Sequence, residues 1–106
     1  MKGTHLGEFQ EFVMLCILIL DDAAYGVSIQ EEIELRMKRS ISRGALQTAL
    51  TRLEEKGFLT SKYGEPTAER GGRRKRFYEV SQKGLKALQE AKSLRQDMWT
   101  LIPKLS

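Results

Sequence analysis

The sequence predicts a mostly α-helical fold that carries one small β-hairpin, and three patterns predict it. Apolar residues recur at helical spacing in several segments that are bounded by capping residues, acidic pairs or glycines. Two short segments near residues 60 and 78 instead alternate, or end in aromatic and β-branched residues, around a glycine-rich stretch. A chain of 106 residues forms one domain with a modest core, which a second copy can complete.

The first predicted helix covers residues 7–20 and is apolar nearly all round. Its longest apolar run has nine residues, 12–20, whereas a helix needs roughly 20 to cross a bilayer. Acidic residues flank this run on both sides, while a signal peptide begins with basic residues. We therefore expect a core helix, part of whose surface meets another chain.

A second helix is predicted over residues 25–38. Ile29, Ile33 and Met37 repeat every four positions, which puts them on one face of a helix. Basic residues close this helix, as its macrodipole favours. Residues 40–41 follow as a short strand or as an extended link.

The third helix is predicted over residues 42–56. Ser42 can accept a hydrogen bond from a free amide of the first turn, and Gly57 lets the chain leave in a left-handed conformation. One face carries four apolar residues at helical spacing: Leu46, Ala49, Leu50 and Leu53. At about 100° per residue, the opposite side carries polar residues. They are Gln47, Thr48 and Thr51, flanked by Arg43 and Arg52.

A hairpin and a long helix complete the chain. Strands are predicted over residues 58–63 and 73–80, and the loop 64–72 between them contains a proline and a glycine pair. Ser81 is the N-cap of a helix that reaches about Leu101. Its apolar residues form a coiled-coil-like seam that nothing else in the chain can cover: Leu85, Leu88, Ala91, Leu94, Met98, Leu101 and Leu105.

The order of these elements is that of a winged helix-turn-helix over residues 1–80, followed by a dimerisation helix over residues 81–106. Charge favours a nucleic-acid partner, because residues 61–106 hold eleven basic and five acidic side chains. Residues 1–60 hold seven basic and nine acidic side chains. The single Cys16 excludes an internal disulfide and fits a cytoplasmic protein. With one histidine and one cysteine far apart, neither a metal site nor another cofactor is expected.

The polar face of the third helix carries the residue types that read base edges and phosphates. Arg43 and Gln47 lie one turn apart and are the predicted base readers, Arg preferring guanine and Gln preferring adenine. Thr48 and Thr51 can reach phosphates or a thymine methyl. Arg52 either contacts DNA or pairs with an acidic neighbour.

Five cations lie within seven positions at the second strand. Such a run is either a solvated face or a set of contacts to backbone phosphates or to an adjacent minor groove. Glu54 and Glu55, at the far end of the third helix, are expected to be exposed and to stay clear of the phosphates. The predicted DNA-binding residues are Ser42, Arg43, Gln47, Thr48, Thr51, Arg70, Arg73, Arg74, Lys75 and Arg76.

Several short motifs resemble the PadR family of bacterial transcription regulators. They are Tyr25-Gly26, Gly44-Ala-Leu46, Arg52-Leu-Glu-Glu-Lys-Gly57, Gly71-Gly-Arg-Arg-Lys-Arg-Phe-Tyr78 and Ser81-Gln-Lys-Gly84. The resemblance covers roughly residues 6–90 and implies a winged-helix DNA-binding domain in a homodimer joined through the first and last helices. It also implies repression relieved by a small molecule. Gln47 departs from the family pattern, in which many members carry Tyr.

Trp99 lies beside the C-terminal seam and has two interpretations. It either packs in the dimer interface, where aromatic residues are enriched, or lines a cavity for a planar, apolar effector. The second interpretation follows the resemblance, since short PadR proteins that sense drugs use an aromatic residue there. Met98, Phe9 and Phe12 are candidates to line the same cavity.

Two other function classes remain open at this point. A non-specific architectural nucleic-acid binder would bind all sequences alike, and a protein-interaction module would show no sequence preference on DNA. Catalysis finds no support, since no nucleophile has a base at a suitable spacing and no phosphate loop occurs.

Overall fold

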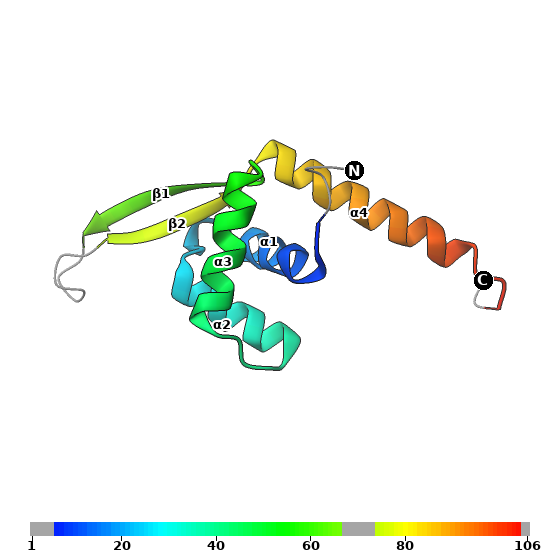
Figure 1. The fold of residues 1–106 in the computed structure, drawn as a ribbon, viewed down its shortest axis with the longest axis horizontal. Helices are drawn as coiled ribbons and strands as arrows, with labels where there is room; N and C mark the ends of the chain where they lie inside the picture. The colour runs from blue at the N-terminus through cyan, green and yellow to red at the C-terminus, as the bar shows by residue number, and fades with distance from the viewer. Residues whose placement is uncertain (1–5, 67–73, 105–106) are drawn as a thin grey trace.

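A computed structural model describes residues 6–66 and 74–104 and confirms the predicted fold class (Figure 1). Three helices come first, then an antiparallel hairpin, then a long helix. A short 3-10 helix, η1, separates the first two α-helices. The elements are α1 (Glu8–Leu20), η1 (Asp21–Ala23), α2 (Gly26–Met37), α3 (Arg43–Glu55), β1 (Leu59–Pro66), β2 (Arg74–Val80) and α4 (Gln82–Thr100).

The predicted caps fix the ends of α3 and α4. Ser42 Oγ accepts a hydrogen bond from Ala45 N at 3.0 Å, and Ser81 Oγ accepts one from Gly84 N at 3.0 Å. Each bond satisfies an amide that a first helical turn leaves without a partner. Gly57 has φ +82, the left-handed conformation predicted at the end of α3.

The first strand is longer than predicted. β1 runs to Pro66 rather than ending at Tyr63, and the pairing with β2 shifts register between these two residues. Gly64 was expected in the loop. It lies in the strand, where the Phe77 ring packs so close to its backbone that a side chain would not fit without a shift. A Cβ on Gly64 would lie 2.8 Å from that ring. A glycine that signals a turn can therefore also permit a cross-strand aromatic contact.

A third segment pairs with the edge of the hairpin. Tyr25 forms an isolated antiparallel bridge with Phe77, and Tyr78 N donates to Ala24 O at 2.9 Å. The link at residues 40–41 forms no strand. Gln30 and Glu34 of α2 hold it through hydrogen bonds of 2.9 Å to the Ile41 carbonyl and amide.

The core lies where α1, α2, α3 and the base of the hairpin meet. Its fully buried large side chains come from all of these elements: Val13, Met14, Ile17, Ile29, Ile33, Leu50, Leu53, Phe58 and Leu59. The apolar face predicted for α3 is buried, since its four residues are at most 5% exposed. We call residues 6–66 and 74–80 the head.

The helix α4 and its C-cap Leu101, which together we call the arm, leave the head and extend away from it, on the side opposite the hairpin (Figure 1). The molecule is accordingly elongated, at 58 × 29 × 22 Å. Gly84 and Leu88 are buried near the start of the arm, but Leu94 and Leu101 are 61% and 79% exposed. The predicted seam is thus uncovered at these two outer positions, and Leu105, its last predicted member, lies outside the described residues.

Candidate nucleic-acid interface

The outer face of α3 presents one continuous polar surface. Leu46, Ala49, Leu50 and Leu53 bury the opposite face and thereby fix the rotation of the helix. The DNA-binding residues predicted at this helix are all exposed, and so is Arg52 beside them: Ser42, Arg43, Gln47, Thr48 and Thr51. Gln47 Nε2 lies 3.4 Å from Thr51 Oγ1, a weak contact that a base edge can replace. The surface is slightly hollowed along Gln47, Thr48, Thr51, Arg52 and Glu55.

Arg43 stands at the N-terminal end of this surface, beside the start of α2. Its Nη1 lies 4.0 Å from the position that a Cβ on Gly26 would take. The positive ends of two helix dipoles therefore lie near the same exposed guanidinium, and such ends favour anions. Arg52 forms no ion pair among residues 6–66 and 74–104, so the acidic neighbour considered from the sequence is not seen there.

The hairpin forms the wing, and its described cations differ in their surroundings. Arg74 is exposed and pairs across the hairpin with Pro66. The ammonium group of Lys75 lies 4.3 Å from the centroid of the Tyr25 ring, a cation–π distance. Two further predicted cations, Arg70 and Arg73, lie outside the described residues.

Arg76 is held within the fold. Its Nη2 donates to Glu54 Oε1 at 2.9 Å, and its Nε donates to Ser61 Oγ at 3.0 Å. Ser61 Oγ in turn donates to Glu54 Oε2 at 2.7 Å. The Glu54 side chain, predicted to be exposed, is only 32% exposed because it packs against the wing. Sequence reasoning missed this network, since its members lie on three different elements.

The four residues considered for an effector do not share a hollow within one chain. Phe12 lies in an apolar hollow with Leu15, Cys16, Ile19, Arg36 and Met37, while Phe9 lines a different one between α1 and α3. Neither hollow includes Trp99 or Met98, which are 61% and 59% exposed on the arm.

An ion pair that the sequence did not indicate joins the arm to the head. Arg95 Nη1 donates to Glu11 Oε2 at 2.6 Å. The hydrogen bond to Glu11 and the charge of that carboxylate raise the pKa of Arg95. Glu11 Oε1 is buried and has no hydrogen-bond partner among the described residues. The two residues are 84 positions apart, so no local pattern could have revealed the pair.

Cys16 is buried in α1, at 3% exposure. Burial, with a smaller contribution from Glu32, raises the pKa of its thiol from 9.0 to about 11. The thiolate, which is the reactive form, is therefore scarce at neutral pH.

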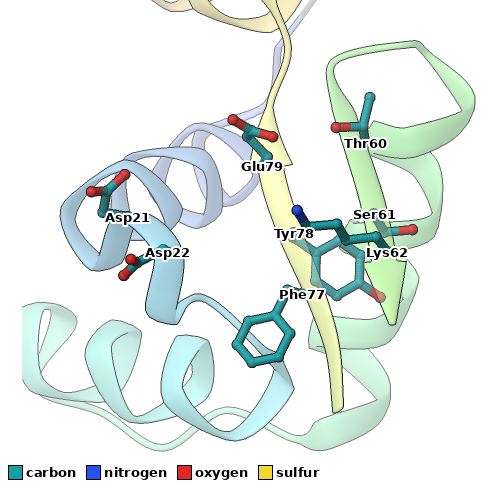
Figure 2. A pocket seen from close by; sticks show the side chains of 8 residues that line it. All are labelled: Asp21, Asp22, Thr60, Ser61, Lys62, Phe77, Tyr78 and Glu79. Atoms are coloured by element: carbon teal, nitrogen blue, oxygen red, sulfur yellow. The ribbon is translucent and has the colours of Figure 1, made fainter. Parts of the chain in front are cut away.

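A further hollow, partly polar, lies away from α3, between η1 and the base of the wing (Figure 2). It encloses about 340 Å³, with Asp21 and Asp22 on one side and Lys62, Phe77 and Glu79 on the other. Within the described ranges, no group of three or more His, Cys, Asp or Glu side chains has the geometry to hold a metal ion. Nor does any helix in that part of the chain have the length and apolarity to cross a membrane.

The chain as a whole is similar to known transcriptional regulators. The model of the transcriptional regulator PadR-like family matches residues 14–90. A transcriptional regulator from Clostridium thermocellum is 26% identical, with a TM-score of 0.69 over 91% of this chain and 88% of that one.

Two further structures share the fold. A PadR-like transcription factor from Bacteroides fragilis is 21% identical, with a TM-score of 0.71 over 92% of this chain and 90% of that one. A PadR family regulator from Clostridium difficile R20291 is 22% identical, with a TM-score of 0.64 over 91% and 96%. Among curated proteins, no match was found.

Proposed function

Because this chain belongs to the PadR-like family of transcriptional regulators, which bind DNA, we propose that it is a homodimeric repressor of a two-fold-related operator. The observation that carries the proposal is the uninterrupted polar face of α3 beside the wing. Each copy inserts α3 into a major groove and rests its wing on the flanking backbone, with half-sites about one helical turn apart.

Within each half-site, Arg43 and Gln47 read base edges, since they stand one turn apart on the exposed N-terminal half of α3. Thr48 and Thr51 contact phosphates or a thymine methyl, and Ser42 offers its hydroxyl beside the first turn. Arg74, together with Arg70, Arg73 and Lys75, supplies the wing's attraction to the backbone. A dimer with about 6 to 10 phosphate contacts loses about 10³- to 10⁵-fold in affinity between 50 and 200 mM salt.

The proposed homodimer joins α1 and α4 of two copies. On α1, the outward apolar side chains Phe12, Leu15, Leu18 and Ile19 are 37% to 56% exposed. On the arm, Leu94, Met98 and Leu101 are exposed as well. Two copies that exchange arms cover both surfaces at once, which removes apolar area from water.

An effector of the planar, apolar class would bind between the arms. Trp99 and Met98 line the proposed cavity, with Phe9 and Phe12 contributed by α1. Phe9 and Phe12 line different hollows within one chain, and neither hollow includes Trp99 or Met98, so the proposal assigns the cavity to the place where two copies would meet. Its occupation changes the spacing of the two heads. Contacts that each contribute about 1 to 3 kcal/mol of discrimination are then lost, and the operator is released.

Selection of bound fragments from random DNA tests the proposal. The expected result is an enriched palindrome whose half-sites are about 10 base pairs apart from centre to centre. Gln47→Ala should then lose about 1 to 3 kcal/mol of discrimination at one base of each half-site. Gln89→Ala, an exposed glutamine on the arm, is the matched control and should change nothing.

Two other results would contradict the proposal. If every fragment binds alike and Gln47→Ala has no effect, the protein coats or bends DNA without reading it. If no DNA is retained at low salt, the basic wing contacts an acidic protein instead.

A further inference from the structure

The wing and α3, the proposed reading helix, are joined by a closed ring of hydrogen bonds. Its three members are Glu54 in the last turn of α3, Ser61 on β1 and Arg76 on β2. Arg76 donates to both of the others, and Ser61 donates to Glu54, at 2.7 to 3.0 Å. Each side of this triangle spans two different elements, so the ring fixes the angle between α3 and the hairpin.

Two tyrosine rings fix the orientation of the arginine. The guanidinium carbon of Arg76 lies 5.8 Å from the centroid of the Tyr63 ring and 5.5 Å from that of Tyr78. Tyr78 is only 5% exposed, so it is a firm wall. A planar guanidinium can contact aromatic rings while donating two hydrogen bonds from its edge, whereas a lysine ammonium cannot make the same fork.

The opposite face of the hairpin is also held. Side chains alternate along a strand, so Lys75 and Phe77 point away from the face that carries Arg76. Both contact Tyr25, which precedes α2: its ring centroid lies 5.6 Å from that of Phe77 and 4.3 Å from the Lys75 ammonium. The wing is therefore gripped between α3 on one face and the start of α2 on the other.

The two described arginines of the wing differ in charge compensation. Arg76 has a carboxylate partner at 2.9 Å, so its charge is already compensated and a phosphate gains less attraction from it, although the side chain is 40% exposed. Arg74 lies two residues earlier on the same strand face, is exposed, and forms no ion pair in the described part of the chain. A free exposed cation is the better phosphate contact of the two.

We propose that Arg76 is a positioning residue rather than a phosphate contact. With Glu54 and Ser61 it sets the angle of the wing, so that Arg74 meets the backbone when Arg43 and Gln47 are in the groove. This inference rests on the proposed operator binding. It assigns Glu54, an acidic residue, a favourable part in binding a polyanion, which is the opposite of what its charge alone predicts.

The test measures operator affinity against salt concentration for Glu54→Gln, Arg76→Gln and the double variant. Each single variant should weaken operator binding about threefold to tenfold. The double variant should bind no more weakly than the weaker-binding of the two single variants, because the effects of interacting residues on affinity do not add. The salt slope of Arg76→Gln should equal that of wild type. Arg74→Gln should reduce the slope by about 2 per dimer, one phosphate contact being lost from each copy.

Three controls separate positioning from charge and from unfolding. Glu55→Gln removes a neighbouring exposed carboxylate and should bind as wild type or slightly tighter. Arg76→Lys keeps the charge but should not restore affinity, because it cannot donate to both partners. Ser61→Ala removes the bridging hydroxyl and should reproduce the loss. Thermal unfolding of each variant shows whether the head remains folded.

The opposite pattern would overturn the inference. If Arg76→Gln lowers the salt slope as Arg74→Gln does, while Glu54→Gln binds as well as wild type, Arg76 contacts phosphate directly. Unchanged affinity in both single variants, or strictly additive losses, would also sink it. Failure of wild type to select any operator is a different result, which removes the proposed function and not merely this role for Arg76.

Discussion

The head and the arm treat their apolar residues in opposite ways. In the head, Ile29, Ile33 and Leu53 are fully buried and the polar face of α3 is left outside. In the arm, Leu94 and Leu101 are more exposed than buried. The head thus forms its core within one chain and leaves mainly the outward face of α1 apolar and exposed, whereas the outer arm has no core of its own and keeps an apolar surface that its own chain does not cover. In the proposed dimer, recognition therefore uses α3 and the wing, while assembly uses the arm together with the outward face of α1.

The arm is nevertheless firmly attached at its base. Gly84 packs so closely on the head that a Cβ there would lie 2.3 Å from the Phe58 carbonyl oxygen. About two turns beyond Leu88, the Glu11–Arg95 ion pair adds a second attachment. The direction of the arm is therefore set by the head even though its outer surface is uncovered.

The largest expected effect comes from charging the outer arm. The double variant Leu94→Asp, Met98→Asp should be monomeric, because it places carboxylates on the surface that a second copy covers in the proposed dimer. Operator affinity should fall about 10²- to 10⁴-fold, since two linked half-site contacts become independent. Light scattering coupled to size exclusion gives the mass, and a binding titration gives the affinity.

Ser93→Asp adds charge at a neighbouring exposed position outside the seam and is the matched control. It should remain dimeric. A wild-type protein that is monomeric at the concentrations used, yet fully selective for its operator, would remove the distinction between head and arm.

A smaller effect, on the stability of the protein, is expected where the arm packs on the head. Gly84→Ala should destabilise the free protein by about 1 to 3 kcal/mol, because a methyl group cannot fit against the Phe58 carbonyl oxygen, Met14 and Val80. Gly44→Ala, in the first turn of α3, meets no atom within 4 Å and should stabilise by about 0.5 to 1 kcal/mol. Urea unfolding of the free protein measures both. Equal effects from the two substitutions would mean that the arm is not seated as described.

The smallest expected signal comes from the effector. Trp99 is the only tryptophan, so intrinsic tryptophan fluorescence reports on the arm alone. A planar aromatic compound that stacks on it should quench or shift the emission in the dimer and not in the Leu94→Asp, Met98→Asp monomer. Unchanged emission across a panel of such compounds would leave Trp99 as an interface residue without a ligand.

The sequence predicts the reading helix well, because both of its ends and its buried face are encoded locally. Ser42, Gly57 and the stripe that includes Leu53 lie within a single stretch, and the structure confirms each of them. The end of β1 was predicted wrongly, since Gly64 and Pro66 are read as loop residues until the Phe77 ring is seen to cross the strand.

The sequence does not predict contacts between charged side chains that lie far apart along the chain. Arg76 looks like one more cation in a basic run, and only the fold brings it to Glu54, 22 positions earlier. Periodicity encodes which face of an element is buried, but it says nothing of which charged residue on one exposed face meets another. The contacts that DNA itself makes with Gln47 and Arg74 stay predictions for the same reason.

Because the Cys16 thiol is buried and unreactive, a newly introduced cysteine can be labelled alone. Such a label makes the distance between the two heads of the proposed dimer measurable. With a pKa raised to about 11 and 3% exposure, Cys16 should escape maleimide and methanethiosulfonate reagents at neutral pH. A single new cysteine on the exposed side of the wing base, such as Thr60→Cys, would then take a spin label alone. Paired labels in an assembled dimer would report the head-to-head distance by pulsed electron resonance, with and without DNA.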